Sequence, residues 1–411
     1  WQPRHERQPA YIIPPIDLTI NGPCGFAYNP GSTTFPDRFA KNFFVVSYVA
    51  APNRCLIQNF SLKPDGAFFA VKETSEFLKG IAMTDLDWGY DGKMYISDYG
   101  GGWVRPNNGN IYTLFDPKRL DDPAVQEVKQ LFAKGLPSLA PEKLFDLLAH
   151  PDQRVRKRAQ FALAERGTAS QPLFEKAIAT DQPLLRRIHG LWGLGQLAYN
   201  DPAALKSLST LLKDSELEVR ANAARTLGNH PEQLAPYREG LLALLNDPSL
   251  RVASLASLAL ANEGHKSIVD PALKLIEQNA DKDVIVRHGG IMMLANAGKA
   301  PDLANLNTHP SPAVRRAAVL ALRRQKAPEI ATFFDDKDTS IRQEAIRAAY
   351  DENIRSAFPA LARRAPEIGK RVTPEVKYHP LSARRAIHAA WTLARPEDLA
   401  VVISIINDPA I

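Results

Sequence analysis

The sequence predicts a multidomain α+β protein, in which about two blades of a β-propeller precede an all-α solenoid of helical repeats. Three observations predict this. Residues 1–116 hold 20 of the 33 aromatic residues and 11 of the 23 glycines, a composition typical of short strands and tight turns. The rest of the 411 residues is rich in Ala, Leu and Arg, which favour helix. A short motif recurs through this second part, as in helical repeat arrays.

The overall composition excludes several classes of protein. Hydrophobic residues make up 45% and charged residues 23%, which is the balance of a folded globular chain rather than a disordered one. No apolar run approaches the roughly 18 residues that a membrane-spanning helix needs. The two cysteines cannot form a disulfide framework or a four-thiolate zinc site, and no clustered Cys/His spacing indicates a zinc site.

The first part contains seven segments with the two-residue alternation of strands, separated by turn signals such as Asn-Pro-Gly and Asp-Gly. They cover residues 25–29, 43–48, 55–60, 68–72, 85–89, 93–97 and 110–114. Four antiparallel strands in about 45 residues are typical of one propeller blade. Fewer than two blades cannot close a ring. Either most of the propeller lies outside this sequence, or the strands form a small open sheet that caps the solenoid.

Both ends of the sequence favour the first of these alternatives. The chain begins without Met, and residues 407–411 resemble the start of a further repeat turn. We therefore expect an internal fragment whose solenoid is truncated at its C-terminus. Cys24 and Cys55 open the first and third strands of one blade, so a neighbouring strand separates them by about 9–10 Å. That is too far for a disulfide, and we expect free thiols.

The second part divides into a helical linker at residues 117–140 and a solenoid at residues 141–411 with about eight repeats. Each repeat contains a turn with Asp or His-Pro, followed by a helix that opens with Val-Arg or a similar pair. The landmark positions are 156, 186, 220, 253, 287, 315, 342 and 384, at steps of 27 to 42 residues. The turn Asp or Ser can cap the second helix, and the Arg can pair with the turn acid of its own or the next repeat. This phrase resembles the HEAT repeat.

Several motifs of the first part resemble a bacterial family. Asn21-Gly-Pro-Cys-Gly-Phe-Ala-Tyr-Asn-Pro-Gly31, Phe43-Phe-Val-Val, Thr84-Asp-Leu-Asp-Trp-Gly-Tyr-Asp-Gly-Lys-Met-Tyr-Ile-Ser-Asp98 and Gly109-Asn-Ile-Tyr112 resemble the closing blades of bacterial membrane-bound dehydrogenases. Those proteins join a glucose/sorbosone-dehydrogenase-like propeller to HEAT repeats, often with a cytochrome c module. The resemblance implies a periplasmic or envelope-associated protein, with pyrroloquinoline quinone and calcium as cofactors. No Cys-x-x-Cys-His motif is present, so haem c is implied only for a longer parent protein.

The order of strands in a blade predicts where its polar residues gather. Asp85 precedes the first strand of its blade and Asp98 follows the second, so both should project at the same end. Asn21 and the loop to Arg54 fall at that end in the preceding blade. We predict Asp85, Asp98 and Asn21 as calcium ligands, because carboxylate and amide oxygens suit this cation.

The same end is expected to carry the groups that bind the quinone. Arg54 or Arg105 could hold the carboxylates of the cofactor, with Trp103 beside them. Blade-turn acids are often structural, and that role stays open for Asp85, Asp87 and Asp98. No catalytic residue is identified.

Two functions follow from these observations. The first is an exported oxidoreductase that acts on sugars or related alcohols through a quinone, with the repeats as a docking scaffold for a protein partner. The alternative is a non-catalytic HEAT-repeat scaffold with a small β-cap. Nucleic acid is disfavoured as a partner, because the arginine clusters lie among nearly as many acids and no aromatic residues are interleaved with them.

Overall fold

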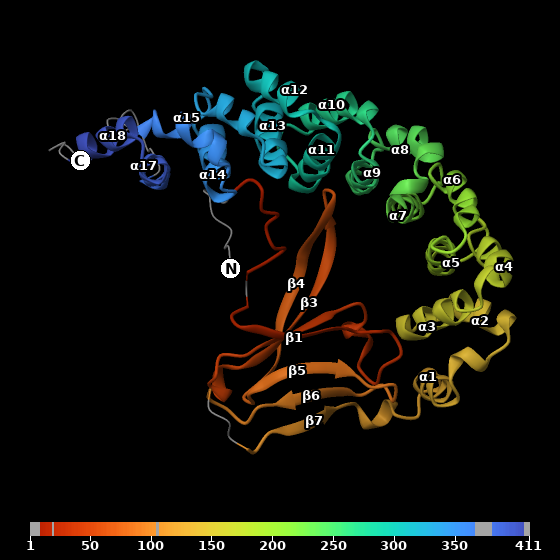
Figure 1. Cartoon of the computed structure of the whole chain (residues 1–411). Helices are drawn as coiled ribbons and strands as arrows, with labels where there is room; N and C mark the ends of the chain where they lie inside the picture. The colour runs from red at the N-terminus through yellow and green to blue at the C-terminus, as the bar shows by residue number, and fades with distance from the viewer. Residues whose placement is uncertain (1–8, 19, 104–106, 366–379, 407–411) are drawn as a thin grey trace. The chain divides into compact units, whose positions relative to one another are not determined.

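The computed structural model describes residues 9–18, 20–103, 107–365 and 380–406 (Figure 1). Two compact units divide the chain. Of the described residues, the first unit contains positions 14–233, and the second contains positions 234–406 together with the short segment 9–13. The predicted boundaries at residues 116 and 140 both lie inside the first unit. The change of composition therefore does not mark the boundary between these units.

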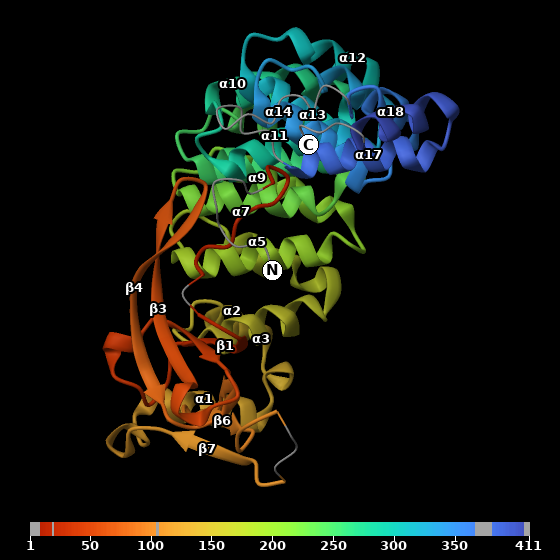
Figure 2. The same ribbon diagram turned by 90° about the vertical axis from the view of Figure 1, so that its left-hand side faces the viewer.

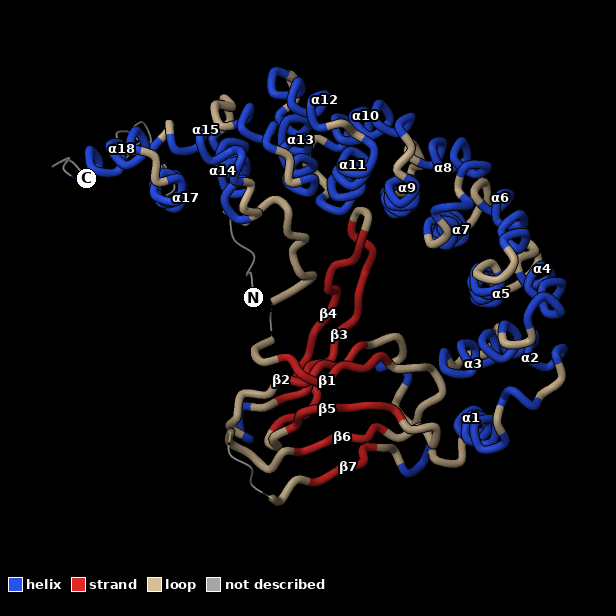
Figure 3. Tube along the Cα trace, in the orientation of Figure 1, coloured by secondary structure: helices blue, strands red, loops and turns tan. Residues whose placement is uncertain are grey.

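The first unit begins with two antiparallel sheets (Figure 3). The first sheet has the order β1-β2-β3-β4 and the second has the order β5-β6-β7. The strands are β1 Pro23–Tyr28, β2 Phe43–Ser47, β3 Leu56–Asp65, β4 Phe68–Lys79, β5 Met83–Trp88, β6 Met94–Asp98 and β7 Asn110–Leu114. All seven predicted strands are confirmed, although β3 and β4 are longer than predicted and form an extended hairpin (Figure 2).

The two sheets share one hydrophobic core. Phe44 and Val46 of β2 and Ile57 of β3 are buried with Leu86 of β5 and Ile96 of β6. Buried residues are interleaved with more exposed ones along β2, β3, β5 and β6, largely as the two-residue period predicts, whereas β4 and β7 contain no buried residue. The described residues form these two small sheets and no closed ring, so the propeller stays a prediction. The order of the strands also separates Cys24 from Cys55 by β2, and both cysteines are free, as expected.

The sheets pack against the first helices of the same unit. Asp152 is fully buried and accepts hydrogen bonds from the amide of Ser32 and from the guanidinium of Arg154. Arg154 also donates to the carbonyl of Gly89 at 2.8 Å. Gly31 has a φ of +127°, and a Cβ atom there would lie 2.6 Å from the carbonyl oxygen of Pro151. Only glycine fits this approach, so the sheets cap the first repeat through specific contacts.

Helix α1 Pro123–Lys134 follows the sheets, and the remaining helices form a solenoid of stacked pairs (Figure 1). In the first unit the pairs are α2 Pro141–Leu147 with α3 Gln153–Ala164, α4 Gln171–Ala177 with α5 Leu184–Leu197, and α6 Leu208–Leu211 with α7 Leu217–Gly228. In the second unit they are α8 Arg238–Leu244 with α9 Leu250–Glu263, α10 Val269–Asn279 with α11 Val284–Ala297, α12 Ala300–Ala304 with α13 Pro312–Gln325, the 3-10 turn Pro328–Phe333 with α14 Thr339–Asp351, and α15 Phe358–Ala362 with α17 Pro380–Leu393. Helix α18 Pro396–Ile406 packs on α17.

The described residues thus contain eight helix pairs, and each of the eight predicted landmarks lies in the second helix of its pair. The helical-repeat prediction is confirmed at this level. Residues 407–411, where a further repeat was expected to begin, lie outside the described residues. Within the described part of the chain, no helix is both long and apolar enough to cross a membrane.

The predicted ladder of landmark arginines and turn acids is confirmed in part, for Arg287 with Asp281 of its own turn and for Arg315. Arg156, Arg220 and Arg315 each donate to two carbonyls of their own turn, five and six residues earlier. Arg315 also pairs with Asp336 in the next turn, with Nε 2.8 Å from Oδ2. In the second repeat this pairing is made by Arg187, one residue after the predicted landmark, which bonds Asp214. The ladder therefore links neighbouring repeats through buried ion pairs.

The predicted helix caps are confirmed only for aspartate. Asp152, Asp283 and Asp338 accept hydrogen bonds from amides of the first turn of α3, α11 and α14. Ser249 and Ser311 occupy the same position at α9 and α13 but make no side-chain cap bond. Before α13, the His309 ring nitrogen instead accepts from the amide of Ser311 at 3.2 Å. The His-Pro turn thus satisfies the amide of the N-cap residue itself, whereas the serine cap expected from the sequence is not formed.

Candidate functional site

The loops predicted to form a cofactor site meet at one end of the two sheets. The amide of Gly102 donates to the carbonyl of Ala50 at 2.8 Å, and the Tyr48 hydroxyl donates to the carbonyl of Gly102. The exposed ring of Trp103 stands edge-on to Tyr48, with ring centroids 5.3 Å apart. The loop after β6 is thereby fixed to the loop after β2. Arg105 lies outside the described residues.

Asp85 and Asp98 lie at the same end of the hairpin formed by β5 and β6. Asp98 pairs with Met83 in the strand register, and Asp85 pairs with Ser97. Each carboxylate accepts a hydrogen bond from a nearby amide, Asp85 from Leu86 at 2.9 Å and Asp98 from Gly100 at 3.0 Å. Such bonds are typical of acids that shape a turn or strand end. They support the structural role that the sequence left open.

Asn21 and Arg54 line a different feature from the two acids. They face a hollow of about 280 Å³ that is also lined by Gln58 and Glu76, and neither Asp85 nor Asp98 lines it. Among the described residues, no group of three or more Asp, Glu, His or Cys side chains could hold a metal ion. Calcium takes six to eight oxygen ligands. Asp85, Asp98 and Asn21 supply only part of such a set, and the calcium site stays a prediction.

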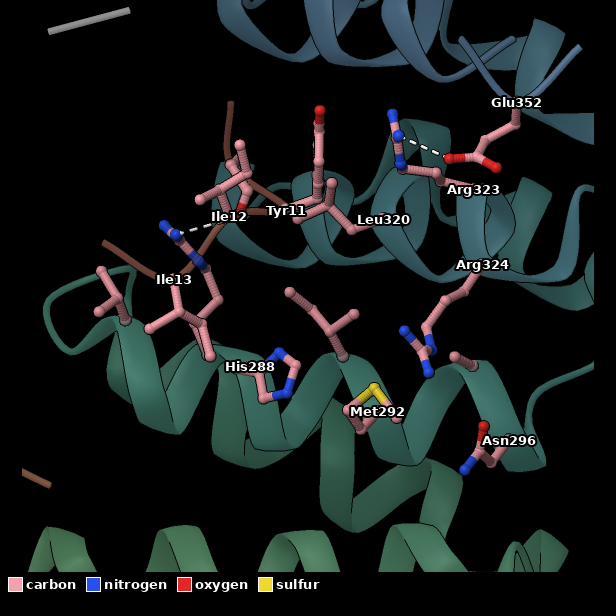
Figure 4. A pocket seen from close by; sticks show the side chains of 15 residues that line it. Tyr11, Ile12, Ile13, His288, Met292, Asn296, Leu320, Arg323, Arg324 and Glu352 are labelled. Atoms are coloured by element: carbon pink, nitrogen blue, oxygen red, sulfur yellow. Dashed lines mark hydrogen bonds and ion pairs between the residues drawn. The ribbon is translucent and has the colours of Figure 1, made fainter. Parts of the chain in front are cut away.

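A second candidate site lies on the inner face of the second unit, where helices α11, α13 and α14 hold a segment of the chain itself (Figure 4). We call Ala10–Ile13 the strap. The amide of Ala10 donates to Oε1 of Glu344 at 3.2 Å, and its carbonyl accepts from the Arg287 guanidinium at 3.3 Å. The Arg323 guanidinium carbon lies 3.7 Å from the centroid of the Tyr11 ring. Both main-chain groups of Ala10 and the aromatic ring beside it are thus recognised.

The groups that hold the strap are themselves held by neighbours. Glu344 is buried on α14 and accepts from Arg347 one turn further along. Arg323 donates to Oε1 of Glu352 at 2.6 Å while its face covers the Tyr11 ring. These supporting contacts fix the rotamers of Glu344 and Arg323, so the site is preorganised for the turn that the strap forms.

A pocket of about 570 Å³ remains beside the strap (Figure 4). Its floor is apolar and includes Ile291, Met292 and Leu320. Basic side chains line the rest, namely Arg287, His288, Arg323 and Arg324, with Glu352 as the single acid among the lining residues. Burial, and then the nearby Arg324 and Arg287, lower the pKa of His288. The pocket is therefore positively charged even when His288 is neutral.

Sequence analysis missed this site, although two of its residues carried a signal. Arg287 occupies a ladder landmark, yet within the described residues it makes none of the turn-carbonyl bonds that Arg156, Arg220 and Arg315 make. The pair Arg323–Arg324 was interpreted as ladder or solvated surface. The strap was not singled out at all, because four residues without a repeat carry no periodic pattern.

Comparisons with known proteins show only general likeness to helical structures. No protein-family model and no curated protein matches the sequence. Among solved structures, Escherichia coli YibA is 17% identical over 63% of this chain and 96% of its own, with a TM-score of 0.39. A phycocyanin lyase complex of CpcE and CpcF from Nostoc is 17% identical over 55% and 93%, with a TM-score of 0.31. A Kap95p complex with RanGDP is 12% identical over 71% and 53%, with a TM-score of 0.42. None of these values reaches the level at which a likeness supports a functional argument.

Proposed function

We propose that this chain is a protein-binding α-solenoid that holds a short peptide turn in the groove formed by α11, α13 and α14. One observation carries the proposal. The strap already occupies this groove as a turn, in which the Ile12 amide donates to the Pro9 carbonyl and Ala10 bonds through both main-chain groups to Arg287 and Glu344. Main-chain bonds of this kind are available to any segment that adopts the same turn, so a segment of another protein could replace the strap. The two sheets act as a cap on the first repeat.

The test is binding of a peptide with the strap sequence to the full chain. A labelled peptide Pro-Ala-Tyr-Ile-Ile-Pro, taken from residues 9–14, is titrated against Tyr11→Ala, in which the strap loses its ring contact with Arg323. We expect saturable binding that is several-fold tighter than to the unaltered chain, where the strap competes. Fluorescence anisotropy measures both affinities.

Two further variants locate the binding. Arg323→Ala in the Tyr11→Ala background should weaken the peptide about 5- to 30-fold, the range of a partly desolvated cation–π contact. Arg355→Ala serves as the control, since Arg355 is exposed on the same unit and does not line the groove. Absence of saturable binding, or equal binding by the Arg323 and Arg355 variants, would refute the proposal.

A quinone-dependent dehydrogenase of sugars or related alcohols is the second candidate, and periplasmic localisation belongs to it. The meeting of the loops that carry Ala50 and Trp103 is the observation that supports it. If this candidate is right, the full chain should bind pyrroloquinoline quinone, and Arg54→Ala should weaken the binding. Spectroscopic titration without a saturable change would exclude it.

A further inference from the structure

We propose that the pocket beside the strap takes an acidic side chain, so that the groove selects a partner peptide carrying Asp or Glu close to an aromatic or aliphatic residue. The inference rests on the proposed function, because it assigns the chemistry of the peptide that the groove binds. It goes beyond that function by naming what the strap itself lacks. Ala10, Tyr11, Ile12 and Ile13 provide no acid.

The pocket is lined by more positive than negative side chains, and a bound acidic group would reduce this excess of positive charge. Its only lining carboxylate, Glu352, already pairs with Arg323 and lies 3.8 Å from the Lys326 amine. Arg324 is exposed and makes no hydrogen bond or ion pair with the described residues. Figure 4 shows its guanidinium directed toward α11, on the side of the pocket away from the strap. Among the residues that the structure describes, Arg324 is therefore a cation that a carboxylate would meet without displacing another acid.

The apolar floor specifies the neighbour of that carboxylate. Ile291 is buried, and Met292 and Leu320 face the pocket beside Tyr11 (Figure 4). An aliphatic or aromatic side chain next to the acid would cover this floor and exclude water from the ion pair. The attraction between opposite charges strengthens as water is excluded. A charged group alone would leave the floor exposed.

The contacts of the strap favour a peptide over a nucleic acid as the occupant. Glu344 accepts the amide of Ala10, whereas a phosphate would be repelled by that buried carboxylate. Arg287 and Glu344 together match the carbonyl and the amide of one residue. An anionic oligonucleotide could form an ion pair with Arg324, but its phosphates would not bond both Arg287 and Glu344.

The experiment compares acidic peptides with their neutral matches. In the full chain carrying Tyr11→Ala, peptides of the strap sequence are titrated with a single Glu, or the isosteric Gln, at each of the positions of residues 10–13. We expect the best Glu peptide to bind about 10-fold tighter than its Gln match, since one charge-assisted bond contributes roughly 1.5 kcal/mol. Arg324→Gln should remove this gain, and Arg355→Gln should keep it.

The outcomes separate the two proposals. If no peptide binds, the groove is not a peptide site and the proposed function fails. If the unaltered strap peptide binds but no Glu peptide exceeds its Gln match, or Arg324→Gln keeps the gain, only the acidic preference is refuted. An oligo-dT strand that competes with the peptide and loses affinity in Arg324→Gln would also overturn it, because the pocket would then accept a phosphate chain.

Discussion

The second helices of the repeats use similar residues in opposite ways in the two units. In the first unit, Arg156 donates to His189, which shares a 2.7 Å hydrogen bond with Gln160, and Gln160 donates to Gln196. These bonds join α3 to α5 and leave the polar atoms satisfied within the solenoid. In the second unit, Arg287, Arg323 and Glu344 bond the strap instead. The first set of residues stabilises the stack of repeats, whereas the second set presents its polar groups to a peptide segment.

The largest loss of stability should distinguish an arginine that bonds the next repeat from one that bonds the strap. The Arg315 and Asp336 side chains are 2% and 1% exposed, so Arg315→Ala leaves a buried, unpaired carboxylate. We expect a loss of about 3–5 kcal/mol in the free energy of unfolding. Arg287→Ala, at the same landmark in α11, should cost only about 1–2 kcal/mol, because Asp281 keeps its ion pair with Arg316 when its 3.6 Å contact with Arg287 is lost. Urea denaturation measures both, and equal losses would contradict the distinction.

The buried network of the first unit should make its stability depend on pH. Burial, and then the nearby Arg156, lower the pKa of His189 to about 3, below its ordinary value of 6.5. The unfolded chain therefore binds a proton that the folded unit refuses. Stability should be fully present above pH 6.5 and fall toward pH 3, by up to about 1.4 kcal/mol per pH unit.

The control for this dependence is His189→Gln, which keeps a polar side chain but does not titrate. Burial also lowers the pKa of His230 and His288, so part of the slope should remain in the variant. Thermal melts from pH 7 to pH 4 measure the difference. An identical slope with and without His189 would show that the imidazole is free to protonate in the folded state.

The contact between Tyr11 of the strap and Arg323 of the groove should give a measurable coupling energy. Tyr11→Ala and Arg323→Ala each disturb other contacts, but together they isolate the ring–guanidinium pair. A double-mutant cycle on stability should give about 0.5–2 kcal/mol. A coupling of zero would mean that the ring and the guanidinium do not interact in solution.

The smallest effect concerns the helix caps of the second unit. Asp283 accepts from the amides of Ile285 and Val286, so Asp283→Ala should cost about 1–2 kcal/mol. Ser311 makes no side-chain cap bond, and Ser311→Ala should stay within about 0.5 kcal/mol of the unaltered chain. Equal losses would show that Ser311 caps α13 after all.

The elements of the fold could be predicted because each is encoded by a local pattern. The strands follow from alternation, as in Met94 to Ile96, and the repeats follow from the Arg landmark and the Asp cap. The predicted site at the ends of the sheets was placed by strand order alone. That argument brought the loops of Ala50 and Trp103 together but could not show that Asp85 and Asp98 bond nearby amides.

The groove could not be predicted because it depends on a contact between distant parts of the sequence. Ala10 and Arg287 are 277 positions apart, and no spacing rule connects them. The cap of the sheets on the first repeat has the same origin, since Ser32 and Asp152 are 120 positions apart. The sequence did offer a landmark arginine, Arg287. Only the structure shows that it bonds Ala10 rather than the turn carbonyls that Arg156, Arg220 and Arg315 bond.

The most direct test of the central claim is hydrogen exchange at the strap in the unaltered full chain. The amides of Ala10 and Ile12 both donate hydrogen bonds, to Glu344 and to the carbonyl of Pro9 respectively. If the groove holds the strap, these two amides should exchange more slowly than in the isolated peptide of residues 9–14, and Arg323→Ala should restore fast exchange. Exchange of both amides at the rate of the free peptide in the unaltered chain would contradict the account.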